Sequence, residues 1–139
     1  GFGPALVRDG AVAQEECSKH SVRFMNPRAG LGMIEPGHYV AIVVDGRQKE
    51  YSIGVTLLEY AEMFVNEGCT VAYNMDGGIS AGIVFMGENL NQHKKGGNGR
   101  ISSQRPWPDA LLFGYSETVP TLDDPIYNTG NLDEKIPRN

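Results

Sequence analysis

The sequence is poor in the residues from which metal sites and disulfide frameworks are built. It has two cysteines, Cys17 and Cys69, and their spacing matches no metal-binding motif. Its three histidines, His20, His38 and His93, show no ligand spacing such as His-x-x-x-His. We therefore predict no metal site and expect two buried thiols, although a disulfide stays open if the protein is exported.

Long apolar runs and an excess of positive charge are also missing. No uninterrupted apolar stretch is long enough to cross a bilayer, so we predict no membrane span. Twelve Lys and Arg residues stand against 17 Asp and Glu residues, and the net charge of −5 argues against general nucleic-acid binding. At 139 residues the chain fits one domain with a real core.

Glycine and proline are abundant, with 18 and 8 residues, and indicate many turns between short strands. Asp9-Gly10 predicts a tight hairpin turn because both residue types tolerate positive φ. We expect a loop over residues 14–21 and a turn at Glu35-Pro36-Gly37. The expected strands are 2–7, 11–13, 28–34, 38–44, a short one beginning at 71, 81–86 with a turn at Gly87-Glu88, and 110–115. The apolar run 39–44 predicts a strand buried on both faces.

One helix is expected, from Leu57 to Glu67. Thr56 and Glu59 form a capping-box pattern at its start, and Gly68 is well placed to end it. Apolar residues behind the cap recur at helical spacing, which predicts a face packed on the core. The fold class is therefore α+β, a mostly antiparallel β assembly with one principal helix packed on it.

Two expected strands end in a carboxylate followed by glycine. The first ends in Asp45-Gly46-Arg47, and the second ends in Asp76-Gly77-Gly78. Glycines allow close approach of a ligand to the backbone, and consecutive amides can form a concave anion site. The simpler interpretation of each motif is a solvated turn.

The order of these motifs is more specific than any one of them. The chain carries, in this order, Phe2-Gly3-Pro4, Asn26-Pro27-Arg28, Asp45-Gly46-Arg47, Ser52-x-Gly54-x-Thr56, Asn74-x-Asp76-Gly77-Gly78-x-Ser80, Asn91, Arg105 and Asp109-Ala110-Leu111. Together they resemble the phosphodiester glycosidase domain family. The resemblance implies a domain over residues 1–116. Residues 117–139 would be a tail that lies on the surface or is partly disordered.

The resemblance implies a hydrolase that cleaves a sugar-1-phosphodiester and releases sugar and a phosphate monoester, with no cofactor. Guanidinium groups would bind the phosphate, and carboxylates would act at the anomeric carbon. The implied catalytic residues are Asp76 and Asp45. The implied substrate- or phosphate-binding residues are Arg28, Arg47, Arg105, Gly77, Gly78 and Ser80. The basic loop 93–100 is expected to be mobile and could close over an anionic ligand. The resemblance also favours an extracytoplasmic or cell-surface location.

Two departures from the family pattern leave other functions open. Ile79 stands where the family has a small or polar residue, and the family's N-terminal segment does not precede Phe2. A non-catalytic module that binds sugar phosphate or glycan is the alternative, and a structural partner in polysaccharide assembly is a third. We also expect association with a copy of the chain or with a second polypeptide, against the strand that begins at Phe2.

Overall fold

The computed structural model of the protein describes residues 3–92, 111 and 113. Contacts divide the chain into two units, Gly1–Trp107 and Pro108–Asn139, and every helix and strand below belongs to the first. The predicted domain boundary at 116, the tail and the loop 93–100 lie outside the described residues. No helix within the described ranges is long and apolar enough to cross a bilayer.

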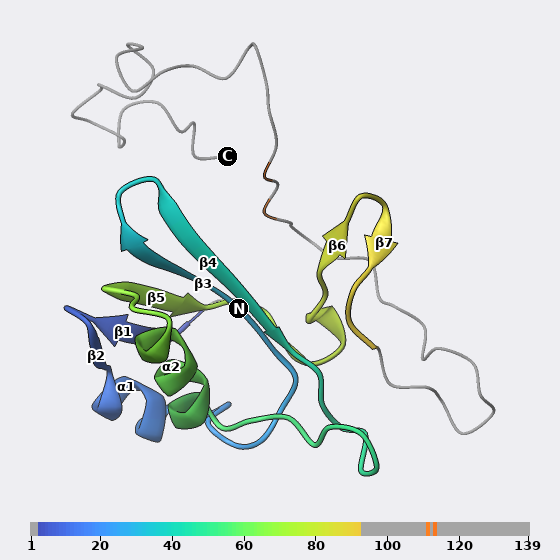
Figure 1. Ribbon diagram of the computed structural model, residues 1–139. Coiled ribbons are helices and arrows are strands. Elements are labelled where there is room, and N and C mark those ends of the chain that lie inside the picture. The colour runs from blue at the N-terminus through green and yellow to red at the C-terminus, as the bar shows by residue number, and fades with distance from the viewer. Residues whose placement is uncertain (1–2, 93–110, 112, 114–139) are drawn as a thin grey trace, which may run out of the picture. The chain divides into compact units, whose positions relative to one another are not determined.

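A five-stranded antiparallel sheet carries the fold, with the strand order β2-β1-β5-β3-β4 (Figure 1). Its strands are β1 Ala5–Arg8, β2 Ala11–Val12, β3 Arg28–Glu35, β4 His38–Val44 and β5 Val71–Asn74. Two helices, α1 (Gln14–Lys19) and α2 (Leu57–Asn66), pack on it, and β6 (Val84–Phe85) and β7 (Glu88–Asn89) form a separate hairpin. The predicted α+β class is confirmed.

The ends of helix α2 follow the predicted capping chemistry. The Thr56 hydroxyl accepts from the Glu59 amide at 3.2 Å, and the Glu59 carboxylate accepts from the Thr56 amide at 2.8 Å. At the other end Gly68 has φ +83°, and the Cys69 amide donates to the carbonyl of Phe64 at 3.0 Å. This closing pattern satisfies carbonyls that would otherwise lack donors, so the helix ends where the sequence predicts.

The core lies between α2 and one face of the sheet. Tyr60 and Phe64 are fully buried and stack edge to face, with ring centroids 5.2 Å apart. Burial raises the pKa of Tyr60, and its hydroxyl donates to the Ile42 carbonyl at 2.6 Å. Cys17 and Cys69 are both free and buried in this cluster, as expected, and burial raises the pKa of each thiol.

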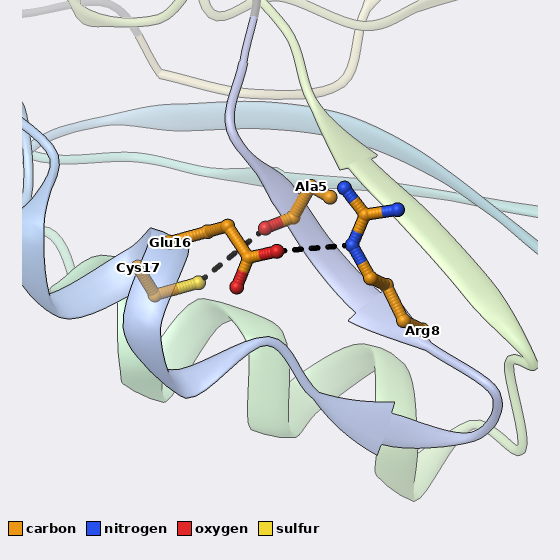
Figure 2. A network of polar contacts seen from close by, with 4 residues as sticks. All are labelled: Ala5, Arg8, Glu16 and Cys17. Carbon is orange, nitrogen blue, oxygen red and sulfur yellow. Dashed lines mark hydrogen bonds and ion pairs between the residues drawn. The ribbon is translucent and has the colours of Figure 1, made fainter.

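The predicted loop over residues 14–21 is wrong, because Gln14–Lys19 forms helix α1. Figure 2 shows how the helix is held: Arg8 pairs with Glu16 at 3.0 Å, and the Cys17 thiol donates to the Ala5 carbonyl at 3.6 Å. Only Cys17 is buried in this helix. A helix this short with one buried residue leaves no apolar period for the sequence to reveal.

Three strand predictions also need correction. The expected strand 81–86 is reduced to β6, and its turn falls at Met86-Gly87, where both residues have positive φ. Leu111 and Phe113 lie in no strand, and the rest of the strand expected at 110–115 lies outside the described residues. The expected burial of both faces of β4 is wrong, since Tyr39 is 51% exposed and no β4 residue is fully buried.

Strand β4 is not buried on both faces because it lies at the edge of the described sheet, where β3 is its partner on one side only. Its inner side chains pack on the core, while the outer face of the sheet is apolar but uncovered by described residues. That outer face carries Leu31, Met33, Tyr39, Ala41, Val71 and Tyr73. Strand β1, by contrast, has β2 and β5 on its two sides, so among the described strands it offers no free edge for pairing with another chain. Association, and its expected place against the strand that begins at Phe2, stay predictions.

Replacing Gly32 by Ala is expected to destabilise the protein by about 1–3 kcal/mol, the usual cost of overpacking. An added Cβ would lie 2.6 Å from Cys69 Sγ and 2.7 Å from the Phe64 ring. Denaturant unfolding of Gly32→Ala measures the loss. In a Cys69→Ala background, where the Sγ atom is absent, the change of Gly32 to Ala should cost less free energy of unfolding than it does in the unaltered protein. An equal loss in both backgrounds would contradict this packing.

The capping box makes a prediction about pH. Hydrogen bonds from Thr56, first its amide and then its hydroxyl, hold the pKa of Glu59 below its usual value. A lowered folded-state pKa stabilises the fold above the unfolded pKa, and this stabilisation is lost as pH falls through the folded pKa. Glu59→Gln should therefore lower the melting temperature at pH 7 and have little effect near pH 3. Glu62→Gln, an exposed change on the same helix, is the control.

Candidate functional site

The sheet register places three segments that carry sequence motifs at one end of the sheet. Strand β3 begins at Arg28, which pairs with Val44 at the end of β4. Gly30, near the same end of β3, pairs with Asn74 at the end of β5. Because β3 is antiparallel to both neighbours, the segments before β3, after β4 and after β5 leave the sheet together (Figure 1).

Asn26-Pro27 lies at the centre of this end of the sheet, enclosed by three glycines from different motifs. An added Cβ would lie 2.7 Å from Pro27 N at Gly46, 2.5 Å from the Asn26 carbonyl at Gly54, and 2.6 Å from the Pro27 carbonyl at Gly77. These neighbours are backbone atoms, which cannot turn aside as a flexible side chain can. Glycine is therefore required at all three positions for the motifs to meet.

Arg47 reaches from the loop after β4 to the turn after β5. Its Nε and Nη2 donate to Asn26 Oδ1 at 3.3 and 2.8 Å, and its backbone has φ +60°, which is unusual for a residue with a side chain. An added Cβ at Gly78 would lie 3.1 Å from Arg47 Nη2. The exposed Arg47 guanidinium therefore lies against the Gly78 backbone. The positive φ of Arg47 is a backbone strain of the kind that is common at functional sites.

Asp76, Gly77 and Gly78 form the turn that Arg47 contacts, and it continues into a 3₁₀ turn, Gly78–Ser80. Asp76 and Ser80 are both half-buried. The Gly77 amide donates to Asp76 Oδ1 at 3.1 Å, and the Gly78 amide donates to the Pro27 carbonyl at 3.0 Å. Both amides thus have partners within the chain, and their predicted role toward a phosphate stays a prediction.

Asp45 is held by three donors from two other segments. The Asn91 side-chain amide donates to Oδ1 at 2.9 Å, while the Gln92 backbone amide and the Tyr51 hydroxyl donate to Oδ2 at 2.8 and 3.2 Å. The hydrogen bond to Asp45 raises the pKa of Tyr51. Tyr51 belongs to no sequence motif and is not among the predicted site residues, and the motif that contains Asn91 does not reveal its partner.

Arg28 is placed differently from Arg47. Its guanidinium is buried and donates to the carbonyls of Val22, Phe24 and Val55, at 2.7 Å to Val22 and 3.2 Å to Val55. Burial lowers its pKa. These bonds tie the loop before β3 to the segment before α2, which is a structural role. Phosphate binding by Arg28 stays a prediction, and Arg105 lies outside the described residues.

The structure thus brings Arg47 into contact with the turn of Asp76, Gly77, Gly78 and Ser80, and anchors Asp45 to residues 91 and 92. Where side chains are described, no cluster of three His, Cys, Asp or Glu residues could hold a metal ion. The exposed Arg47 guanidinium can bind an anionic oxygen, and it lies against Gly78, two residues after Asp76 in the chain, where glycine lets a ligand approach the backbone.

The chain is similar to a curated protein and to several solved structures, of which two are described here. The SPbeta prophage-derived uncharacterized protein YomE of Bacillus subtilis (strain 168) is 31% identical over 117 residues, which are 84% of this chain and 17% of that protein. A hypothetical protein from Synechocystis matches with a TM-score of 0.53 and 23% identity over 65% of this chain and 17% of its own. The catalytic domain of zebrafish N-acetylglucosamine-1-phosphodiester alpha-N-acetylglucosaminidase, auto-inhibited by its pro-peptide, matches with a TM-score of 0.54 and 22% identity over 77% of this chain and 38% of its own.

The two solved structures confirm the fold, and this chain spans well under half of each relative's length. The model of the phosphodiester glycosidase family matches residues 1–114, which include every motif named above. The predicted resemblance is confirmed. The chain belongs to the phosphodiester glycosidase family, a family of hydrolases.

Proposed function

We propose that this chain hydrolyses a sugar-1-phosphodiester. Water adds to the anomeric carbon, the bond from that carbon to the phosphate oxygen breaks, and a sugar and a phosphate monoester are released. The observation that supports this most is the contact between Arg47 and Gly78, which joins a phosphate-binding side chain to the turn that carries Asp76. The zebrafish relative acts, by its name, on a sugar-1-phosphodiester.

Arg47 is the proposed phosphate ligand. Asn26 Oδ1 accepts from both Nε and Nη2, so the plane of the guanidinium is fixed before any substrate arrives. A planar guanidinium matches two phosphate oxygens at once, and a preorganised one loses less rotamer entropy on binding. The net charge of the chain is −5, so attraction of an anionic substrate has to come from local cations such as Arg47.

Asp76 is the proposed reacting carboxylate. It comes directly before the two glycines, and a sugar whose phosphate is bound by Arg47 would present its anomeric carbon nearby. Positive charge develops at that carbon as the bond to the phosphate breaks, and a carboxylate stabilises it or activates water. Phosphate is a good leaving group, so the reaction does not require a strong general acid.

A non-catalytic sugar-phosphate or glycan-binding module is the second candidate. Ile79 favours it, because this apolar side chain follows the glycine pair, is 38% exposed and can neither donate nor accept a hydrogen bond. Such a module would bind a sugar 1-phosphate and release no product from any diester. For either function, the family resemblance favours an extracytoplasmic location.

Removing the Arg47 guanidinium tests the phosphate ligand. Arg47→Gln should weaken binding of a sugar 1-phosphate about 10- to 100-fold, since hydrogen bonds to charged groups contribute about 1.5–3 kcal/mol. Arg47→Lys should recover part of the loss, because it restores charge but not the planar fork. Isothermal titration measures both, with Arg8→Gln at the far end of β1 as control. Equal affinities for Arg47→Gln and Arg8→Gln would exclude Arg47.

Asp76→Asn tests the reaction. It should lower turnover of a panel of sugar-1-phosphodiesters by about 10²–10⁴-fold and leave sugar 1-phosphate binding largely intact. Release of free sugar is the measurement, with melting temperature as the control for folding. Full activity of Asp76→Asn would remove Asp76 from the mechanism. An unaltered protein that binds sugar 1-phosphate but releases no sugar would favour the binding module.

A further inference from the structure

Asp45 and Asn91 join three segments of the candidate site. Asp45 follows β4, and Asn91 follows the β6–β7 hairpin, 46 residues later in the chain. Their side chains meet at 2.9 Å, and the next residue, Gln92, adds its backbone amide to the same carboxylate at 2.8 Å. Gln92 also accepts at its carbonyl from Gln48 Nε2 at 2.9 Å, so the bond network spans the loop that carries Arg47.

The orientation of the Asn91 amide is fixed by its partners. Its Nδ2 donates to Asp45 Oδ1 and to the Ala81 carbonyl at 3.1 Å, and both of these oxygens can only accept. Its Oδ1 accepts from the Ile83 amide at 2.9 Å. The position therefore needs one group that donates on one side and accepts on the other. Asparagine meets this need, and an ionised aspartate does not.

This bonding reaches the turn that carries Asp76. Ala81 follows the 3₁₀ turn Gly78–Ser80 directly and is buried. Asn91 anchors the Ala81 carbonyl, so it fixes the chain where that turn ends. On the other side, Asp45 lies two residues before Arg47. The Asp45–Asn91 pair thus links the loop that carries Arg47 to the chain at Ala81, which follows Asp76 and the two glycines.

We propose that Asp45 and Asn91 are positioning residues, and that Asp45 serves as a hydrogen-bond acceptor and not as a reacting carboxylate. The inference rests on the proposed function and gives distinct roles to Asp76 and Asp45, the two carboxylates that the family resemblance implies as catalytic. Both Asp45 oxygens are already occupied by donors from Asn91, Gln92 and Tyr51. Asp76 keeps the reacting role proposed for it above from its place before Gly77 and Gly78, and the Asp45–Asn91 pair sets the distance between Arg47 and Asp76.

Asn91→Asp tests the pair without any assay of activity. An ionised aspartate would face Asp45 and the Ala81 carbonyl, whereas a protonated one would donate to Asp45 as the amide does. Repulsion raises the folded-state pKa of the pair, so the fold is stable at low pH and loses stability as pH rises through that raised pKa. Asp45 and Tyr51 are the titratable groups whose described hydrogen bonds converge there.

Thermal unfolding of Asn91→Asp should show a melting temperature about 5 °C or more below that of the unaltered protein at pH 8, and a clearly smaller difference at pH 5. Asn89→Asp is the matched control, because it makes the same change at an exposed position two residues earlier, in β7. The proposal is overturned if both variants lose the same stability, or if the loss for Asn91→Asp does not depend on pH.

Kinetics separate positioning from reaction. The kcat of Asp45→Asn should stay at least 10-fold above the kcat of Asp76→Asn. The pH profile of Asp45→Asn should also keep its acid limb, the fall in rate at low pH. Loss of that limb, with a fall in kcat as large as for Asp76→Asn, would make Asp45 a reacting group and overturn the proposal. If the unaltered protein hydrolyses no diester, the proposed function fails, while the pH-dependent melting of Asn91→Asp still decides whether the pair holds the site together.

Discussion

The enclosure of Asn26-Pro27 by glycines is the constraint on which the candidate site depends. Gly46, Gly54 and Gly77 each approach this dipeptide so closely that a single Cβ would overlap its backbone. The contacts bring the ends of β4 and β5 to the start of β3, and they leave Asn26 Oδ1 in place to hold Arg47. The spacing of the motifs along the chain therefore follows from one packing arrangement, in which backbone lies directly on backbone.

Much of the fold could be predicted because local chemistry and tertiary packing agree. Thr56, Glu59 and Gly68 determine both ends of α2, and Asp9-Gly10 determines the first hairpin. Helix α1 could not be predicted, since a single buried residue, Cys17, has no periodicity. The apolar run of β4 indicates two apolar faces, but sequence does not say what covers the outer one.

The candidate site was predictable in its residue types and only partly in its contacts. Arg28 and Arg47 are equivalent in the sequence, each in a motif beside a strand end, yet Arg28 is buried on carbonyls and Arg47 is exposed against Gly78. Burial depends on where loop 22–26 folds, and no local pattern encodes that. The partners of Asp45 are likewise distant in sequence, since Asn91 lies beyond a helix, a strand and a hairpin.

The central claim is that Arg47 and the Asp76-Gly77-Gly78 turn form one binding site for a sugar phosphate. Titration of ¹⁵N-labelled protein with N-acetylglucosamine 1-phosphate, followed by NMR, tests it most directly, with sodium sulfate as the ionic control. The account predicts saturable shifts of the Gly77 and Gly78 amides and of the Arg47 side-chain Nε–H, at sugar-phosphate concentrations where sulfate shifts none of them. Saturable shifts confined to other residues, or no shift at these three groups, would contradict it.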